Sequence, residues 1–329
     1  MKIVGLEEHF AIPELIDAWH ALEPQWQDVA LANSADGERS LRLMDLDAER
    51  IEAMNDTGID VSVVSVSTPG LQNLAPADAV ALQAMCNDRL ADAVRNRPHR
   101  LQGFATLATP DPDAAAAELG RAVSELGFHG AMLYGRTRDR SLDHQDFWPI
   151  FEAAQALHAP LYLHPQSPPP AVRAAYYSGL GDGVGAALAT HGVGWHYDAG
   201  LQFIRLILNG VLDRFPGLQF ILGHWGEVML FYLDRIDRLT GIAKLPRPLS
   251  EYVRSNVFIT PGGVFSERYL QWALDVVGPD RIMFASDYPY VLAPGEGSRK
   301  FLEKAEISDA NRVKIASGNW ERLCADIRR

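Results

Sequence analysis

Short apolar segments rich in β-branched residues recur along the chain, and longer stretches with helical periodicity separate them. The apolar segments cover residues 3–6, 59–66, 101–107, 130–134, 160–164, 219–224, 257–260 and 282–287. Apolar residues spaced three or four apart predict helices at residues 46–57, 78–94, 112–125, 147–157, 199–214, 227–238 and 266–277. Strands that alternate with helices in this way predict parallel β-α-β units, whose strands are buried on both faces.

Eight such units favour a single (β/α)8 barrel domain, a TIM barrel, over residues 1–329. An open doubly wound α/β sheet is the competing architecture, but no GxGxxG motif follows the first apolar segment. Two insertions interrupt the alternation of predicted strands and helices. One follows strand 1 (residues 11–40) and the other follows strand 5 (residues 166–197). We expect both to form pocket walls or lids, because long insertions after strand ends lie on the catalytic face. Peripheral decoration or oligomer contacts are the alternative.

Composition excludes several classes of protein. The 42 acidic residues exceed the 30 Lys and Arg by 12, and the basic residues form no cluster, which argues against nucleic-acid binding. No apolar run approaches the roughly 18 residues of a membrane span, and two glutamates interrupt the N-terminal apolar segment, so no signal peptide is expected. Cys86 and Cys324 are too few for a disulfide framework and are interpreted as buried. We therefore expect a soluble, cytoplasmic protein.

Titratable residues stand at the C-terminal ends of four of the predicted strands. They are Glu7 and His9 on strand 1, His164 on strand 5, His224 on strand 6 and Asp287 on strand 8. Burying such groups without partners is costly, so we expect them to converge on water, substrate or a metal ion.

Strand geometry indicates which of these side chains can bind the same metal ion. Because side chains alternate with period two, Glu7 and His9 share a face while Glu8 points away. With His164 and Asp287 they supply two imidazoles and two carboxylates, which suits Zn²⁺ or another borderline ion, and the second carboxylate favours Mn²⁺ somewhat. The alternative is that each is a hydrogen-bonded structural residue. Four such residues on three strand ends favour the metal.

His224 lies in a Gly-His-Trp-Gly-Glu sequence, and Glu227 is expected to begin the following helix. Glu227 could cap that helix, or it could accept a hydrogen bond from His224 and so orient a general base. Arg235, two turns further along, is either an anion clamp or part of an outward salt bridge. Nucleophilic chemistry has little support, because the chain has no GxSxG motif and no P-loop.

At this point the residues resemble a known family. The Glu7-x-His9 pair, the sequence His164-Pro165, residues 222–227 (LGHWGE) and residues 286–289 (SDYP) resemble the amidohydrolase superfamily, in particular its aminocarboxymuconate-semialdehyde-decarboxylase-like branch. Within that branch, the sequence LEEHF at residues 6–10 is most similar to the γ-resorcylate and 2,3-dihydroxybenzoate decarboxylases.

The resemblance implies a carboxy-lyase that acts in aromatic compound catabolism, assembles as a homodimer or homotetramer and needs no organic cofactor. Its substrate would be a small hydroxylated aromatic carboxylic acid, decarboxylated without oxidation on one divalent ion, Zn²⁺ or Mn²⁺. The implied metal ligands are Glu7, His9, His164 and Asp287. Asp287 would protonate the ring carbon that bears the carboxylate, and His224 with Glu227 would set the protonation state of Asp287.

The resemblance also implies substrate contacts. Arg235 aligns with an arginine of the family's substrate pocket. Tyr134 stands where family decarboxylases often carry Asn, so the ring substituents are expected to be held differently. Tyr134, Tyr288, Tyr290 and Phe10 could build an aromatic slot for a planar substrate, with plain core packing as the alternative for each.

Two other functions remain open. A hydrolase or hydratase of the lactonase type would use a metal-bound water as nucleophile, with Asp287 or His224 as its base. A non-enzymatic barrel that serves as a scaffold or binding module is the third class, and the intact set of strand-end residues disfavours it.

Overall fold

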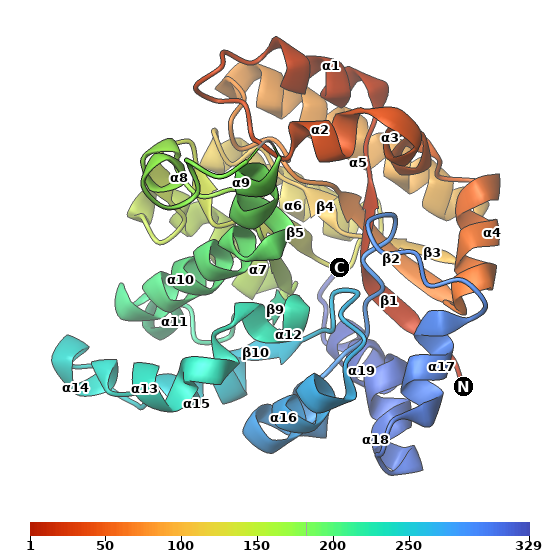
Figure 1. Cartoon of the computed structure of the whole chain (residues 1–329), viewed down its shortest axis with the longest axis vertical. Helices are drawn as coiled ribbons and strands as arrows, with labels where there is room; N and C mark the ends of the chain where they lie inside the picture. Colours follow the sequence, from red (N-terminus) through yellow and green to blue (C-terminus); the bar gives the residue numbers. More distant parts are fainter. Residues whose placement is uncertain (182) are drawn as a thin grey trace.

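The computed structural model describes residues 1–181 and 183–329, in which helices surround parallel β-strands (Figure 1). The strands are β1 Val4–Phe10, β2 Val61–Val66, β3 Leu101–Gly103, β4 Ala105–Thr106, β5 Ala131–Tyr134, β6 Arg136–Thr137, β7 Arg140–Ser141, β8 Leu161–His164, β9 Phe220–Leu222 and β10 Val257–Ile259. The helices are α1 Pro13–Ala21, α2 Leu31–Ala35, α3 Gly37–Met44, α4 Ala48–Thr57, α5 Pro76–Asn96, α6 Pro112–Ser124, α7 Trp148–Leu157, α8 Pro170–Tyr176, α9 Val184–Ala187, α10 Gly194–Leu208, α11 Val211–Arg214, α12 His224–Glu227, α13 Leu233–Ile236, α14 Leu239–Ala243, α15 Leu249–Asn256, α16 Glu267–Val277, α17 Gly297–Lys304, α18 Asp309–Val313 and α19 Asn319–Ala325.

The long strands pair in parallel. One sheet has the order β1-β2-β3, and a second has the order β10-β9-β8-β5-β4. The segment that follows residue 281 makes parallel bridges from Ile282 to Ile259 of β10 and from Phe284 to Gly5 of β1. The predicted strand at 282–287 therefore exists as isolated bridges, and the one predicted at 101–107 is divided into β3 and β4. The predicted α/β class with parallel strands is confirmed.

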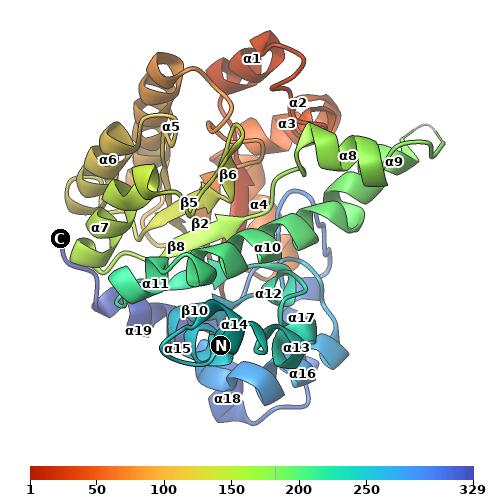
Figure 2. The ribbon, with the colours of Figure 1, turned by 90° about the vertical axis from the view of Figure 1, so that its left-hand side faces the viewer.

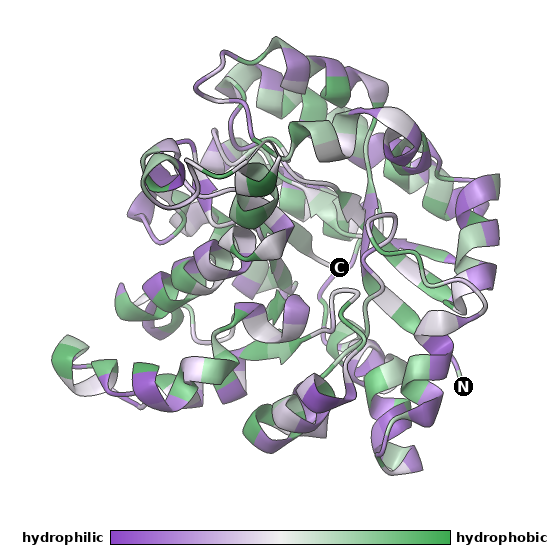
Figure 3. Ribbon diagram, in the orientation of Figure 1, coloured by the Kyte–Doolittle hydropathy of each residue, from purple (hydrophilic) through white to green (hydrophobic). Residues whose placement is uncertain are grey.

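Two groups of apolar side chains account for the core. The larger one lies between strands and helices and includes Phe10, Leu90 and Phe203. The smaller, inner one joins Trp320 and Leu323 of α19 to residues on or next to successive strands: Val4, Leu6, Val61, Val63, Phe104, Met132, Tyr162, Ile221, Phe258 and Met283. Figure 3 shows hydrophobic and hydrophilic residues sharing the same helices, with hydrophilic positions along the outer edge of α4.

Helix α5 illustrates how the sequence specifies an element. It begins at Pro76, which suits the first helical turn because that turn's N–H groups need no intrahelical acceptor. Its buried positions Leu82, Cys86 and Leu90 recur every four residues and pack on the sheet. The buried position of Cys86 agrees with the prediction, whereas Cys324 is only partly buried.

The predicted helix 227–238 is wrong. The chain forms the short turn α12, a 3₁₀ turn at Leu230–Tyr232 and then α13. Every residue from His224 to Val228 has a positive φ, between 44° and 86°, so the turn is left-handed. The apolar periodicity after residue 227 comes from side chains that pack on the core from these separate turns. The predicted helix 199–214 is likewise divided, because Gly210 adopts φ 75° between α10 and α11.

The two predicted insertions contact each other. Residues 11–40 hold α1, α2 and the start of α3, while residues 166–197 hold α8, α9 and the start of α10; residue 182 lies outside the described residues. Asp28 accepts hydrogen bonds from the backbone N–H and the hydroxyl of Ser167. Figure 2 shows α8 and α9 beyond the end of α10 that lies farther from α11. Among the described helices, none has both the length and the apolar character needed to cross a membrane.

Candidate metal centre and catalytic residues

An irregularity in β1 determines which way its polar residues point. Gly5 pairs with Ser62 and Glu8 pairs with Val64, so β1 carries one more residue than β2 between these two pairs. Such a bulge resets the alternation of side chains. Leu6 belongs to the inner apolar group, yet the next residue, Glu7, also points inward.

The bulge also explains why residue 5 is a glycine. Glu8 turns to the other side of β1, where its carboxylate accepts hydrogen bonds from the backbone N–H of Ser286 at 2.9 Å and from its hydroxyl at 2.6 Å. A Cβ on Gly5 would lie 2.3 Å from Glu8 Oε1, so any other residue there would displace the Glu8 carboxylate. Glu8 thus fastens β1 to the segment that carries Asp287.

Glu7, His9 and His164 form a buried group whose ligand atoms all lie within 4.8 Å of one another. Glu7 Oε1 is 3.3 Å from His164 Nε2, and Glu7 Oε2 accepts a hydrogen bond from the Tyr162 hydroxyl at 2.6 Å. His164 Nδ1 lies 2.7 Å from the carbonyl oxygen of Pro165, which can only accept. In the neutral ring the Nε2 lone pair of His164 is therefore directed toward Glu7.

Unpartnered atoms in this group test whether a metal ion fits. Glu7 Oε1 and both ring nitrogens of His9 are buried without a hydrogen-bond partner. Each such atom costs about 1–3 kcal/mol if left unsatisfied. Burial lowers the pKa of His9 to about 4 and that of His164 to about 3, so both rings are neutral near pH 7. Neutral imidazole and carboxylate are the forms that bind divalent ions, and the residues present fit one.

Asp287 joins the same region from the segment beyond Phe284. Its Oδ1 is 3.5 Å from His9 Nε2, and it forms a second potential ligand group with Glu7 and His224. Burial raises the pKa of Asp287 to about 7, although the nearby His224 charge acts in the opposite direction. The structure therefore brings all four residues that the sequence singled out as ligands to one place.

His224 and Glu227 form a tight pair beside this group. His224 Nδ1 is 2.7 Å from Glu227 Oε1, and His224 Nε2 is 3.9 Å from Glu7 Oε1. Burial alone would lower the pKa of His224, but the charges of Glu227 and Glu7 raise it to about 10. Burial alone would raise the pKa of Glu227, but His224 and His196 lower it to about 2. Both shifts favour an imidazolium facing a carboxylate.

The helix-capping interpretation of Glu227 is wrong. Glu227 has φ 53° and lies at the end of a left-handed turn, and the predicted helix that it would cap does not form. Its carboxylate faces His224 and His196 instead. The interpretation as an orienting acid thus has the geometry that it requires.

The four aromatic residues of the predicted slot are not equivalent. The Tyr134 ring lies 5.7 Å from His164 and its hydroxyl donates to Val66 O at 3.1 Å. The Tyr290 ring lies 5.6 Å from His9, and its hydroxyl bonds both Ser34 and Ser67. These two tyrosines flank the candidate ligands.

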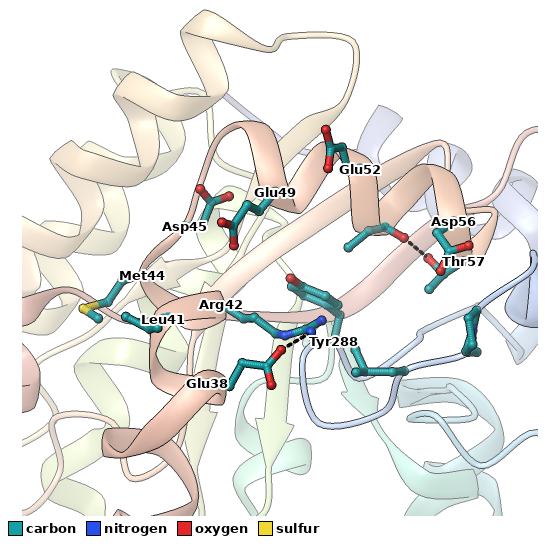
Figure 4. A pocket seen from close by; sticks show the side chains of 14 residues that line it. Glu38, Leu41, Arg42, Met44, Asp45, Glu49, Glu52, Asp56, Thr57 and Tyr288 are labelled. Atoms are coloured by element: carbon teal, nitrogen blue, oxygen red, sulfur yellow. Dashed lines mark hydrogen bonds and ion pairs between the residues drawn. The ribbon is translucent and has the colours of Figure 1, made fainter.

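Phe10 and Tyr288 face elsewhere. Phe10 is fully buried in the apolar core between strands and helices. Tyr288 packs under the Arg50 guanidinium, 5.1 Å away, and lines a groove of about 970 Å³ between α3, α4 and residues 288–294 (Figure 4). Acidic side chains dominate that groove: Glu38, Asp45, Glu49, Glu52 and Asp56.

Arg235 is exposed. It lines a mostly apolar groove of about 730 Å³, together with Tyr177 of the second insertion, Tyr232 and Val228. Glu227 borders the same groove. A contact of Arg235 with substrate stays a prediction.

Sequence reasoning missed Tyr162, which donates a hydrogen bond to Glu7, and it missed two further residues near the site. Arg39 of α3 lies 5.3 Å above the Tyr290 ring, and its charge acts on Asp287. His196 of α10 is 2.8 Å from Glu227 Oε2 through its Nδ1. Both residues come from the insertions, where no motif or strand end marks them.

Comparisons with known proteins identify the family. The amidohydrolase family model matches residues 16–323. The chain therefore belongs to the amidohydrolase family. This amidohydrolase is 34% identical to the γ-resorcylate decarboxylase of Polaromonas sp. strain JS666 over 97% of each chain. The resemblance stated from the motifs is confirmed.

Solved structures extend the comparison. The 5-carboxyvanillate decarboxylase of Sphingomonas paucimobilis is 30% identical to this amidohydrolase, with a TM-score of 0.90 and 99% of each chain covered. A dihydroxybenzoic acid decarboxylase from Polaromonas sp. JS666, with bound manganese and the inhibitor 2-nitroresorcinol, is 32% identical with a TM-score of 0.84, covering 98% of this chain and 97% of that one.

Proposed function

We propose that this amidohydrolase catalyses the metal-dependent, nonoxidative decarboxylation of a hydroxylated aromatic carboxylic acid of the hydroxybenzoate type. The observation that carries the proposal is the buried group of Glu7, His9 and His164, whose unpartnered donor atoms lie beside the His224–Glu227 pair. The full-length similarity to γ-resorcylate decarboxylase supplies the reaction class.

We further propose one (β/α)8 barrel domain across residues 1–329. The bridges of Ile282 to β10 and of Phe284 to β1 support closure of the two sheets around a common interior. Residues 11–40 and 166–197 then follow the first and fifth barrel strands. Because Asp28 bonds Ser167, the two insertions would cover the same end of the barrel, where the strand-end residues lie.

The proposed metal ligands are Glu7, His9, His164 and Asp287. We favour manganese over zinc, because two carboxylates suit Mn²⁺ and the Polaromonas relative holds manganese. A bound ion would supply Lewis-acid chemistry and a template for the substrate's carboxylate and phenolate oxygens. The chain's own residues would carry out the proton transfers.

Asp287 is the proposed acid. Its carboxyl proton goes to the ring carbon that bears the carboxylate, and a C–H bond forms. The bond to the carboxylate then breaks, its electron pair restores the aromatic ring, and CO₂ leaves. Burial favours the protonated form of the Asp287 carboxyl, which suits a proton donor. His224, held by Glu227, would set the protonation state of Asp287 from the neighbouring position.

Substrate recognition would depend on Tyr134 and Tyr290, whose rings flank His164 and His9. Aromatic rings beside the candidate ligands suit a planar acid. Arg235 and Phe10 were also proposed from the sequence, but their positions in a surface groove and in the core give them less support.

The test is a product assay with manganese-loaded protein and 2,6-dihydroxybenzoate, together with other hydroxybenzoates. We expect one CO₂ and one decarboxylated phenol per substrate consumed. Asp287→Asn should abolish turnover, because the amide cannot donate the carboxyl proton. Substrate loss without CO₂ release, or turnover of lactones instead, would favour the hydrolase or hydratase alternative.

A further inference from the structure

Glu227 is held from two sides. His224 Nδ1 approaches Glu227 Oε1 at 2.7 Å, and His196 Nδ1 approaches Glu227 Oε2 at 2.8 Å. The two imidazole rings also lie against each other, with centroids 4.5 Å apart. Each carboxylate oxygen thus accepts one imidazole N–H, and the carboxylate cannot rotate without breaking both hydrogen bonds.

The start of α10 connects this carboxylate to both insertions. Trp195 Nε1 donates to Ser167 Oγ at 3.1 Å, and Ser167 in turn bonds Asp28 of the first insertion. The next residue, His196, reaches Glu227, and its other ring nitrogen lies 3.1 Å from the carbonyl oxygen of His191. Trp195 and His196, which are consecutive in sequence, therefore link the two insertions to the His224–Glu227 pair.

The backbone of α10 also lies directly against the turn that carries Glu227. Gly200 is one helical turn after His196, and a Cβ there would lie 2.4 Å from the carbonyl oxygen of Glu227. His224, Trp225, Glu227 and Val228 all adopt positive φ, which is unfavourable for residues with a side chain. A turn of this kind depends on neighbouring contacts to hold its shape, and α10 provides them.

We propose that His196 is a positioning residue that couples the second insertion to the His224–Glu227 pair. It keeps Glu227 in the orientation that pairs with His224, and it can do so only while the start of α10 is docked on the turn. The inference rests on the proposed function, because turnover reports the state of His224.

Variants of His196 can be chosen by which imidazole nitrogen their side-chain amide replaces. In His196→Asn an amide N–H can occupy the position of Nδ1, whereas in His196→Gln the amide reaches toward the position of Nε2. We expect His196→Ala and His196→Gln to lower kcat by about 10- to 100-fold, and His196→Asn to recover most of it. KM and bound manganese per chain should change little. His191→Ala, which keeps the backbone carbonyl, is the matched control and should behave as wild type.

A double-mutant cycle separates positioning from general structural damage. In a Glu227→Gln background, His196→Ala should lower kcat by less than about 3-fold, because its route to His224 is already broken. If the kcat losses of His196→Ala and Glu227→Gln multiply in the double variant, the proposal is overturned. Two bound metal ions in wild type, with one lost in His196→Ala, would also overturn it and would make His196 a metal ligand instead.

A readout without substrate keeps this proposal distinct from the decarboxylase function. In protein loaded with Zn²⁺, which is diamagnetic, the low-field proton resonance of His224 Nδ1–H should shift or disappear in His196→Ala and return in His196→Asn. An unchanged resonance would overturn the coupling. Failure of every hydroxybenzoate to release CO₂ from wild type would overturn the proposed function alone, since the resonance still tests the contact.

Discussion

The strand-end group and the insertions contribute to one site by different physical means. Glu7, His9 and His164 are placed by strands whose backbone hydrogen bonds and inner apolar side chains leave little freedom. Arg39 lies on the eight-residue helix α3, and His196 lies in the first turn of the 15-residue helix α10. That first turn is linked to the second insertion by the hydrogen bond from Trp195 to Ser167. The strands therefore hold the candidate ligands in fixed positions, and the insertions bring in groups whose position depends on docking.

This difference matters for the chemistry. A metal ion needs its ligands preorganised, because each misplaced donor loses affinity. Proton transfer and substrate entry require a cover that can open, and such covers come from the less stable parts of a fold. If the strands bind the ion and the insertions act on turnover, substitutions of the strand-end residues should remove the ion. Substitutions in the insertions should leave the ion bound and change turnover or substrate affinity.

The largest effect should follow from breaking the strand-end group. His164→Ala removes the nitrogen that lies 3.3 Å from Glu7 Oε1, so we expect loss of bound manganese and activity reduced by at least about 10³-fold. Elemental analysis and the CO₂ assay check both. His20→Ala, an exposed histidine on α1, should retain metal and activity. Full metal content in His164→Ala would contradict the ligand assignment.

Glu227→Gln should have the next largest effect. The amide cannot accept both imidazole N–H groups as a carboxylate does, so His224 loses the charge that raises its pKa. We expect kcat to fall by about 10²- to 10³-fold, in the range seen when a general acid–base group is disabled. Manganese per chain should stay at the wild-type value. Loss of the ion in this variant would assign Glu227 to the metal group instead.

Much of the strand-end group was predictable from sequence, for a physical reason. Buried parallel strands are continuous apolar runs, so a histidine or carboxylate at the end of one is conspicuous, as at His164 and Asp287. The bulge before Glu8 was not predictable, because it depends on how β1 registers with β2. Nor was the left-handed turn at His224–Glu227, since the apolar spacing after residue 227 is the same as that of a helix.

The insertion residues lacked any comparable signal. His196 lies before an ordinary amphipathic stretch, and its partner Glu227 is 31 residues away. Arg39 lies on a short helix with no motif around it. Contacts of this kind arise from tertiary packing of irregular segments, and neither period two nor period 3.6 marks them.

The bulge allows a sharper test of the strands. Gly5→Ala would place a Cβ 2.3 Å from Glu8 Oε1 and disturb the hydrogen bonds to Ser286 that fasten the Asp287 segment. We expect a loss of about 1–3 kcal/mol in the free energy of unfolding, measured by urea denaturation. Gly120→Ala is the matched control, because Gly120 lies inside α6 with nothing near its Cβ position and should gain up to about 1 kcal/mol.

The smallest effect should come from the contact between the insertions. Asp28→Ala removes the acceptor for the Ser167 hydroxyl and backbone N–H, which is worth about 1 kcal/mol at a partly buried site. Because α8 follows Ser167, we expect faster amide hydrogen exchange in residues 167–177 and a KM raised by about 2- to 5-fold, with kcat and bound manganese unchanged. Asp17→Ala, on the exposed side of α1, should change none of these. A loss of manganese in Asp28→Ala would mean that the insertions help to hold the ion. It would contradict the prediction that only the strand-end residues do so.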